Sequence, residues 1–199
     1  MFWQQVHQLD QLITLTINSW YSNFTDPIWD FFSDKIVWIP MYAGIVALLI
    51  WKLGWKKGLI VVAAAGLTFG FCDQFSNIIK YAVARIRPVN DEFMLANGLH
   101  VIETGGGYSF FSAHAANAFG LACSTFFGLL GSLKYKPSWL KAYGGWMFFW
   151  ASMVSISRVF VGKHYLGDIM AGAIVGAVAG MFFGWLASRV IDSYVKIDK

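Results

Sequence analysis

Charged residues are scarce in this chain. Lys, Arg, Asp and Glu make up 13% of its 199 residues, whereas a soluble domain has about a quarter. Hydrophobic residues account for 57% and aromatic residues for 18%. Because low hydrophobicity is a precondition of intrinsic disorder, a disordered chain is excluded as well. The composition therefore predicts an integral membrane protein, folded as one compact bundle rather than as two domains.

Cysteines and clustered carboxylates are also few. Cys72 and Cys123 lie in apolar stretches without a CxxC spacing, which supports neither a disulfide framework nor a zinc site. No grouping of carboxylates suggests magnesium or manganese, so we expect no metal and no other cofactor. The N-terminus lacks a basic region and a small-residue cleavage site, and we expect no signal peptide there.

Five stretches have the length and apolar character of membrane spans, for which a helix needs about 20 residues. They are Ile36 to Leu53, Gly58 to Ile79, Phe110 to Leu133, Tyr143 to Val161 and Leu166 to Val190. The sequence thus predicts an all-α integral membrane protein, with a bundle of about five transmembrane helices over residues 36–199.

The first 35 residues have a different pattern. Apolar residues recur there at helical spacing, namely Phe2, Val6, Leu9, Ile13, Ile17 and Trp20. The other face of the same helix carries Gln4, Gln5, Gln8, Gln11 and Thr14. This pattern is typical of an amphipathic helix that lies in the membrane interface. The competing interpretation is a sixth, short span.

The basic residues predict the orientation in the membrane. With five spans, three clusters fall on one side: Lys52, Lys56 and Lys57; Lys134, Lys136 and Lys141; Arg189, Lys196 and Lys199. The positive-inside rule makes that side cytoplasmic. The net charge of +4 therefore reflects topology and a phosphate site, and we expect no nucleic-acid partner. The remaining basic residues, apart from Lys35, fall on the outer side against the rule, which calls for a functional explanation: Lys80, Arg85, Arg87, Arg158 and Lys163.

Three motifs converge on that outer face. Lys80 and Arg87 are seven residues apart at the end of the second span, so we expect them on one helical face, with Pro88 ending the helix. Ser112 and His114 open the third span, where the free N–H groups of a helix N-terminus suit a phosphate oxygen.

The third motif holds a nucleophile and a carboxylate. His164 and Asp168 are four residues apart at the start of the last span, which predicts that they share one helical face. A carboxylate there can fix the imidazole tautomer and leave the other ring nitrogen free to attack. Ionisable residues at membrane depth are functional by default.

Together these motifs resemble the signature of the type 2 phosphatidic acid phosphatase superfamily, K-x6-RP, PSGH and SR-x5-H-x3-D. The first part is complete in Lys80, Arg87 and Pro88, and the third is complete in Ser157, Arg158, His164 and Asp168. The second part reads Phe111-Ser112-Ala113-His114, with Phe in place of Pro and Ala in place of Gly. The resemblance covers residues 58 to 187.

The resemblance implies a role for each matching residue. His164 would attack phosphorus and form a phosphohistidine, Asp168 would orient its ring, and His114 would protonate the leaving oxygen and then activate water. The phosphate oxygens would be bound by Lys80, Arg87, Arg158, Ser112 and the backbone at Ala113. Arg85 and Lys163 would reach a second phosphate or an acidic headgroup. Charge neutralisation by three cations suits phosphoryl transfer and predicts metal-independent catalysis, which the resemblance implies is inhibited by vanadate.

Two further patterns bear on the architecture. Gly172, Gly176, Gly180 and Gly184 follow Asp168 at steps of four, and small residues at this spacing let helices approach closely in lipid. The loop from about Val89 to Gly107 contains a run of three glycines, and such a loop can contribute to headgroup recognition. His7 and His100 are expected outside the catalytic site.

We therefore expect a lipid phosphatase of the bacterial inner membrane, multi-pass, with its site facing the periplasm or cell exterior. The resemblance implies four substrates: undecaprenyl diphosphate and lipid A as the leading pair, then phosphatidylglycerol phosphate and phosphatidic acid. The partners would be this lipid and the bilayer, without an obligate protein partner. The alternatives are a lipid-binding or transport protein without turnover and, against the predicted spans, a vanadium haloperoxidase.

Overall fold

The computed structural model describes residues 2–197, with side chains up to residue 193. Helices make up the regular structure of this part, apart from one isolated bridge between Ile86 and Tyr108. The order is α1 (Phe2–Asn18), α2 (Asp26–Ser33), α3 (Ile39–Leu53), α4 (Trp55–Val83), the 3-10 turn η1 (Pro88–Asn90), α5 (Glu92–Ala96), α6 (Ala113–Ser132), α7 (Ser138–Phe160) and α8 (Leu166–Ile197). The prediction of an all-α fold is confirmed for the described residues.

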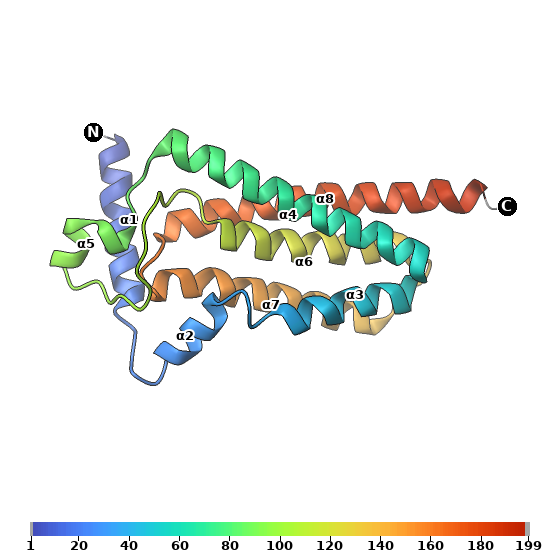
Figure 1. The fold of residues 1–199 in the computed structure, drawn as a ribbon, viewed down its shortest axis with the longest axis horizontal. Coiled ribbons are helices and arrows are strands. Elements are labelled where there is room, and N and C mark those ends of the chain that lie inside the picture. The colour runs from blue at the N-terminus through green and yellow to red at the C-terminus, as the bar shows by residue number, and fades with distance from the viewer. Residues whose placement is uncertain (1, 198–199) are drawn as a thin grey trace.

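Five helices, α3, α4, α6, α7 and α8, run along the molecule as an elongated bundle (Figure 1). Helix α6 packs on α8, α4 and α7, and its contact with α8 is the most extensive. A Cβ atom on Gly172, Gly176 or Gly180 would overlap a backbone oxygen of α6 or its N-cap, at Ser112, Ala116 and Gly120 in turn. The expected close approach of the last helix is therefore observed, and small residues on α8 meet α6 once per turn.

Three helices are long and apolar enough to cross a membrane in the part of the chain that the structure describes: Trp55–Val83, Ala113–Ser132 and Leu166–Ser193. Helix α3 is a shorter apolar helix, and α7, with 23 residues, is not among the three. The five predicted spans correspond in position to α3, α4, α6, α7 and α8. The chain is a membrane protein, and these three helices of its bundle are candidate membrane spans.

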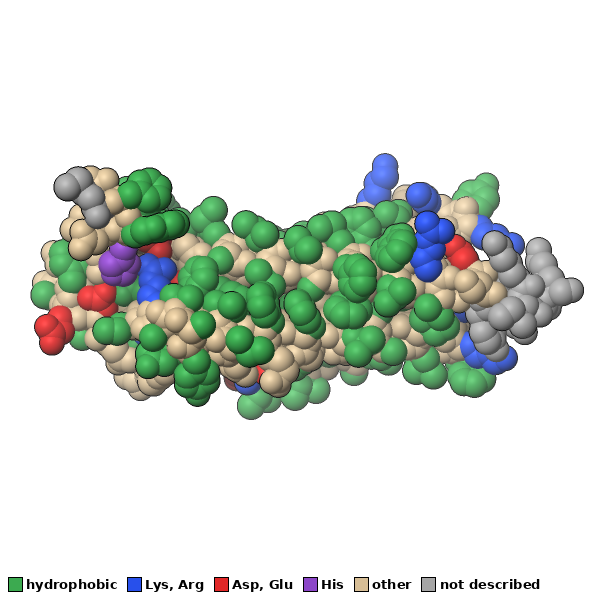
Figure 2. Space-filling view, turned by 90° about the horizontal axis from the view of Figure 1, so that it is seen from above, with side chains coloured by type: hydrophobic (Ala, Val, Ile, Leu, Met, Phe, Trp, Pro, Cys, Tyr) green, Lys and Arg blue, Asp and Glu red, His purple; other side chains and the backbone are tan. Residues whose placement is uncertain are grey.

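The surface of the bundle is divided by residue type. Hydrophobic side chains cover the middle of the face drawn in Figure 2, and most Lys and Arg side chains on that face gather at the end that carries the C-terminus. The α3–α4 and α6–α7 connections lie at this same end (Figure 1). Exposed apolar residues on the bundle include Leu67 and Phe71 of α4 and Ile174 and Phe182 of α8, which suit contact with lipid.

The N-terminal segment forms two helices rather than one. Helix α1 lies across the end of the bundle and not along it (Figure 1). Its exposed side chains include Phe2, Trp3 and Leu9, whereas Gln11, Thr14 and Asn18 are buried against the bundle. Part of the polar face of this amphipathic helix therefore packs on protein, and an apolar face is left exposed.

Candidate active site

The predicted site residues come from segments that meet at the end of the bundle covered by α1. The end of α4, the connection from α4 to α6, and the α7–α8 junction all reach this end (Figure 1). Backbone hydrogen bonds link them: Ser112 N donates to the Asp168 carbonyl at 3.0 Å, and Ser109 N donates to the Arg85 carbonyl at 2.8 Å. The three sequence motifs are thus joined through their main chains.

The first motif differs from its predicted geometry. Helix α4 ends at Val83, because Ala84 adopts a left-handed conformation with φ 51° and its N–H closes on the Lys80 carbonyl. Arg87 therefore lies beyond the helix in extended backbone, and the prediction that Lys80 and Arg87 share one helical face is wrong. The two side chains still interact electrostatically, since the chain turns back after Ala84.

His164 and Asp168 form a buried pair. The His164 Nδ1 atom lies 3.5 Å from Asp168 Oδ2, and both side chains are almost fully buried. Helix α8 begins at Leu166, so His164 precedes the helix instead of sharing a helical face with Asp168. Its position is fixed by α7, because the N–H groups of Lys163 and His164 both donate to the Arg158 carbonyl.

Asp168 receives several donors besides His164. Its Oδ2 atom accepts a hydrogen bond from Tyr165 N at 3.0 Å and a short one from Ser109 Oγ, and its Oδ1 atom accepts one from Arg85 Nη1 at 2.7 Å. Ser109 Oγ also lies 3.3 Å from His164 Nδ1. The sequence analysis missed Ser109, although it lies three residues before Ser112 in the second motif. These donors hold the carboxylate in one orientation.

The second ring nitrogen of His164 faces the cations. Arg87 Nη1 lies 3.2 Å from His164 Nε2, and because a guanidinium can only donate, Nε2 accepts and carries the lone pair. Nδ1 then holds the proton and faces Asp168. Burial lowers the pKa of His164 to about 4, with Asp168 acting in the opposite direction. At neutral pH the imidazole is uncharged, as a nucleophile must be.

Arg158 is held by residues that the sequence analysis did not assign. Glu103 accepts from Arg158 Nη1 at 3.0 Å and from Nη2 at 3.3 Å, and Ser33 of α2 forms short bonds with both side chains. Burial alone would raise the pKa of Glu103, but Arg158 and Ser33 hold it below its usual range. The Nε atom of Arg158 is buried without a partner among the described residues, which leaves one donor for a ligand.

The second motif forms the start of α6 as expected. Ser112 is its N-cap, and the Ser112 hydroxyl accepts from Ala115 N at 3.4 Å. Ala113 and His114 follow in the first turn, and His114 interacts electrostatically with Arg158, His164 and Lys80. His114, Lys80, Arg87, Arg158 and His164 therefore belong to one cluster of charged and titratable groups.

Two residues that the sequence assigned to headgroup contact have partners inside the protein. Arg85 forms ion pairs with Asp168 and with Asp10 of α1, each at 2.7 Å. Lys163 donates a short hydrogen bond to the Thr104 carbonyl, and so supports the loop between α5 and α6.

An apolar groove opens beside His114. It has a volume of about 630 Å³ and runs between α3, α4, α6 and α7. Its walls are mainly aliphatic and aromatic, and include Ile45, Leu49, Phe69 and Trp150. The polar residues that line it besides His114 include Ser33, Lys35, Asp73, Asn117 and Thr125. The groove places a long apolar surface next to a site rich in cations.

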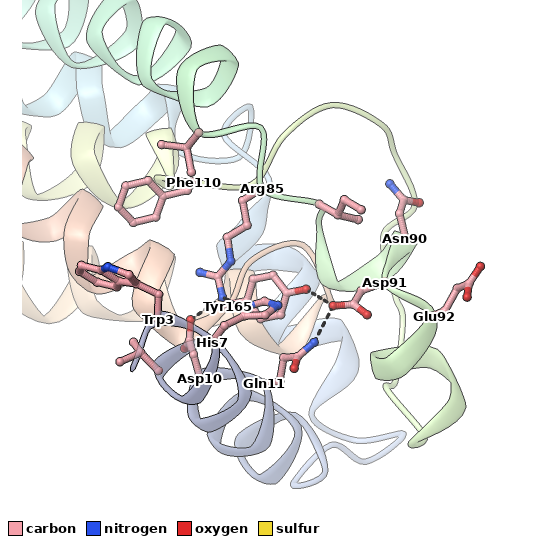
Figure 3. Close-up of a pocket in the computed structure, with 13 residues that line it drawn as sticks. Trp3, His7, Asp10, Gln11, Arg85, Asn90, Asp91, Glu92, Phe110 and Tyr165 are labelled. Atoms are coloured by element: carbon pink, nitrogen blue, oxygen red, sulfur yellow. Dashed lines mark hydrogen bonds and ion pairs between the residues drawn. The ribbon is translucent and has the colours of Figure 1, made fainter. Parts of the chain in front are cut away.

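A second cavity, of about 840 Å³, lies under α1 (Figure 3). Arg85 points into it from one side, and His7, Asp10 and Gln11 face it from α1. Asp91 accepts hydrogen bonds from Gln11 Nε2 at 2.8 Å and from the Tyr165 hydroxyl at 2.6 Å. This cavity is separate from the groove at His114.

Comparisons with known proteins agree with this geometry. A family model described as the PAP2 superfamily matches residues 54–192. A lipid A 4'-phosphatase of Bacteroides thetaiotaomicron is 36% identical over 185 residues, which cover 92% of this chain and 78% of the relative. An undecaprenyl-diphosphatase of Sulfolobus acidocaldarius is 32% identical over 147 residues, which cover 73% of this chain and 61% of the relative.

A solved structure has the same fold. It is the transmembrane PAP2-type phosphatidylglycerolphosphate phosphatase of Bacillus subtilis, which superposes with a TM-score of 0.74 at 18% identity. The match covers 94% of this chain and 88% of that one. At this identity the likeness concerns the fold.

Proposed function

The chain belongs to the PAP2 superfamily and is a PAP2-type lipid phosphatase, and from that premise we propose that His164 releases phosphate from a membrane lipid at the end of the bundle covered by α1. The observation that carries the proposal is that two features lie side by side. A buried histidine whose lone pair on Nε2 faces Arg87 lies in a cation cluster, and an apolar groove of about 630 Å³ begins at His114 of the same cluster. A phosphate and a lipid tail are the two parts of one substrate that such a site fits.

In the first step His164 Nε2 attacks phosphorus. A bond forms between Nε2 and phosphorus and the bond between phosphorus and the lipid oxygen breaks. His114, which takes up a proton when the anionic phosphate occupies the cation cluster, gives that proton to the lipid oxygen. Asp168 stays ionised, accepts a hydrogen bond from the Nδ1–H group and stabilises the positive charge that the imidazole acquires. Lys80, Arg87 and the free Nε of Arg158 neutralise the charge on the phosphoryl oxygens, which is the main requirement of phosphoryl transfer.

In the second step water replaces His164 on phosphorus. His114, now neutral, takes a proton from the water, whose oxygen forms the new bond to phosphorus while the bond to Nε2 breaks. Inorganic phosphate leaves and His164 returns to its starting form. The residues in this scheme supply both proton transfer and charge neutralisation, so we expect the reaction to run without a metal ion.

For the substrate we propose the phosphate of lipid A or a closely related phosphoglycolipid. The relative that covers 92% of this chain is a lipid A 4'-phosphatase, which favours this class. Undecaprenyl diphosphate is the second candidate, on the strength of the undecaprenyl-diphosphatase relative. Both lipids carry a phosphate on a long apolar anchor, as the groove requires.

We also propose how the protein sits in its membrane. The Lys-rich end faces the bacterial cytoplasm, following the positive-inside rule, and the His164 site faces the periplasm or cell exterior. The exposed apolar residues of α1, among them Phe2, Trp3 and Leu9, contact lipid at that outer interface, as an amphipathic interfacial helix does.

The proposal is tested by phosphate release from four purified lipids with the protein in detergent and EDTA. The lipids are lipid A, undecaprenyl diphosphate, phosphatidylglycerol phosphate and phosphatidic acid. We expect release to be fastest from lipid A, to persist in EDTA and to stop with vanadate. Release that depends on an added divalent metal, or no release from any of the four, would contradict the proposal.

The groove is tested by filling it. Ala65 of α4 lines the groove, and Ala65→Trp should lower kcat/KM for a long-chain lipid far more than for a water-soluble phosphate monoester. Ala63 lies on the exposed side of the same helix and does not line the groove, so Ala63→Trp is the matched control. Equal effects of both variants on the two substrates would show that the lipid tail binds elsewhere.

A further inference from the structure

Two polar side chains of α1 contact the start of helix α8. Leu166 N donates to Thr14 Oγ1 at 3.0 Å, and Gly167 N donates to Asp10 Oδ1 at 2.9 Å. The first N–H groups of a helix have no partner within the helix itself. Two side chains of α1 therefore cap α8, although about 150 residues separate them in sequence. Asp168 lies one residue beyond this capped pair.

Arg85 connects α1 to the catalytic carboxylate. Its Nη1 atom lies 2.7 Å from Asp168 Oδ1, and its Nη2 atom lies 2.7 Å from Asp10 Oδ2 and 3.1 Å from His7 Nδ1. The guanidinium also stacks over the Tyr165 ring at 3.8 Å, and Figure 3 shows it enclosed between α1 and Tyr165. A planar guanidinium with donors in a fixed fork holds two carboxylates in a defined arrangement.

The charges in this chain of contacts bear directly on His164. Asp168 must keep its negative charge directed at His164, because the imidazole becomes positive when it attacks phosphorus. Arg85 acting alone would neutralise that charge from the other side. Asp10 supplies a second carboxylate to the same guanidinium, so the Arg85 charge is divided between two partners.

We propose that Asp10 is a positioning residue for the His164–Asp168 pair, which holds Arg85 in place and limits how far Arg85 neutralises Asp168. This role rests on the proposed phosphatase reaction. Asp10 does not touch the substrate, since its contacts are with Arg85 and the start of α8. The N-terminal helix then contributes a positioning residue to the active site, although it lies outside the matched family region of residues 54–192.

A change at Asp10 alters the electrostatic potential that the charged and titratable groups around the His164–Asp168 pair produce. They are His7 and Asp10 from α1, Lys80 from α4, Arg85 and Arg87 from the segment after α4, His114 from α6, Arg158 from α7, and Tyr165 and Asp168 at the start of α8. Asp10→Asn removes one negative charge from this set and keeps an oxygen to cap Gly167. The positive potential at His164 rises, which disfavours the protonated imidazole.

The experiment compares four full-length variants with the wild-type protein by steady-state kinetics across pH. For Asp10→Asn we expect kcat to fall by about tenfold, the size typical of losing a residue that orients a catalytic group, with KM within about twofold. The acid limb of its kcat/KM profile should move to lower pH by about half a unit, as expected for a screened charge beyond the first contact. Asp10→Glu should restore part of the activity and of the profile.

Two controls distinguish positioning from folding. Thr14→Val removes a cap from α8 without changing charge, so it should leave the pH profile in place, and Gln8→Ala alters an exposed residue of α1 and should change nothing. If Asp10→Asn matches Thr14→Val, with no shift of the profile, Asp10 is only a cap and the proposal is overturned. Failure of the wild-type protein to release phosphate would overturn the proposed function instead, before any variant is compared.

Discussion

At the residue scale, the site contains one histidine whose two ring nitrogens are in different surroundings. Nδ1 faces the Asp168 carboxylate, and Nε2 faces the Arg87 guanidinium. Four donors surround the Asp168 carboxylate: Arg85, Ser109, His164 and Tyr165 N. This arrangement assigns the lone pair to Nε2, which lies on the side of the cations that would bind phosphate.

The neutral state of His164 is itself testable. Burial lowers its pKa to about 4, well under the ordinary histidine value of about 6.5. The folded imidazole therefore stays neutral until the pH falls toward 4. The unfolded chain takes up this proton already near pH 6.5, so the free energy of unfolding decreases as the pH falls from about 6.5 toward 4. We expect NMR of 15N-histidine-labelled protein, assigned with a His164→Gln variant, to show a resonance that titrates near pH 4. A titration near 6.5 would contradict this environment.

Residues of the site were predictable from sequence where they belong to local motifs. The spacing of Lys80, Arg87, Arg158, His164 and Asp168 predicted the cation cluster and the proposed nucleophile. Asp10, Ser33 and Glu103 were not found, because each acts through an arginine between 55 and 125 residues away. Only the folding of α1, α2 and the α5–α6 loop over the bundle end brings these acceptors to their arginines.

At the element scale, the contact between α6 and α8 fixes the position of the site. Gly172, Gly176 and Gly180 lie against Ser112, Ala116 and Gly120, so the two helices are in register at every turn. The glycine spacing predicted that the last helix packs closely on a neighbour, since small residues four apart form one face, but it did not name α6 as that neighbour. It did not predict where helices end, because Ala84 leaves α4 through a left-handed conformation that its residue type does not signal.

Substitution of a contact glycine should separate these helices. A Cβ on Gly176 would overlap the Ala116 carbonyl oxygen, so Gly176→Ala should destabilise the protein by about 1–3 kcal/mol, as overpacking does. Gly70 of α4 has open space around it, and Gly70→Ala should be neutral or stabilising by about 0.5–1 kcal/mol. Thermal unfolding in detergent compares the two. Equal melting temperatures would show that the α6–α8 contact can relax without cost.

At the scale of the whole molecule, the protein has two chemically different ends. Figure 2 shows Lys and Arg gathered near the C-terminus and an apolar middle, while the candidate site and α1 lie at the opposite end (Figure 1). A lipid whose phosphate lies at one membrane surface would meet the site there, with its tail in the groove that continues from His114.

The orientation of the protein in its membrane can be measured by introducing one cysteine at a time. Cys72 and Cys123 are buried, so a membrane-impermeant maleimide should not label the wild-type protein in intact spheroplasts. Glu92 lies exposed at the site end and Tyr135 is 85% exposed in the α6–α7 connection. We expect Glu92→Cys to be labelled at once and Tyr135→Cys only after permeabilisation. The reverse pattern would place the site in the cytoplasm.

The most direct test of the central claim traps the phosphorylated enzyme. After rapid quenching during turnover of a phosphate ester with a good leaving group, mass spectrometry at neutral or basic pH should find phosphate on His164. His164→Ala should carry none and release no phosphate, and His114→Gln should accumulate the phosphoenzyme because the second step lacks its base. Phosphate release by His164→Ala, or turnover with no phosphate on His164 in any variant, would contradict the account.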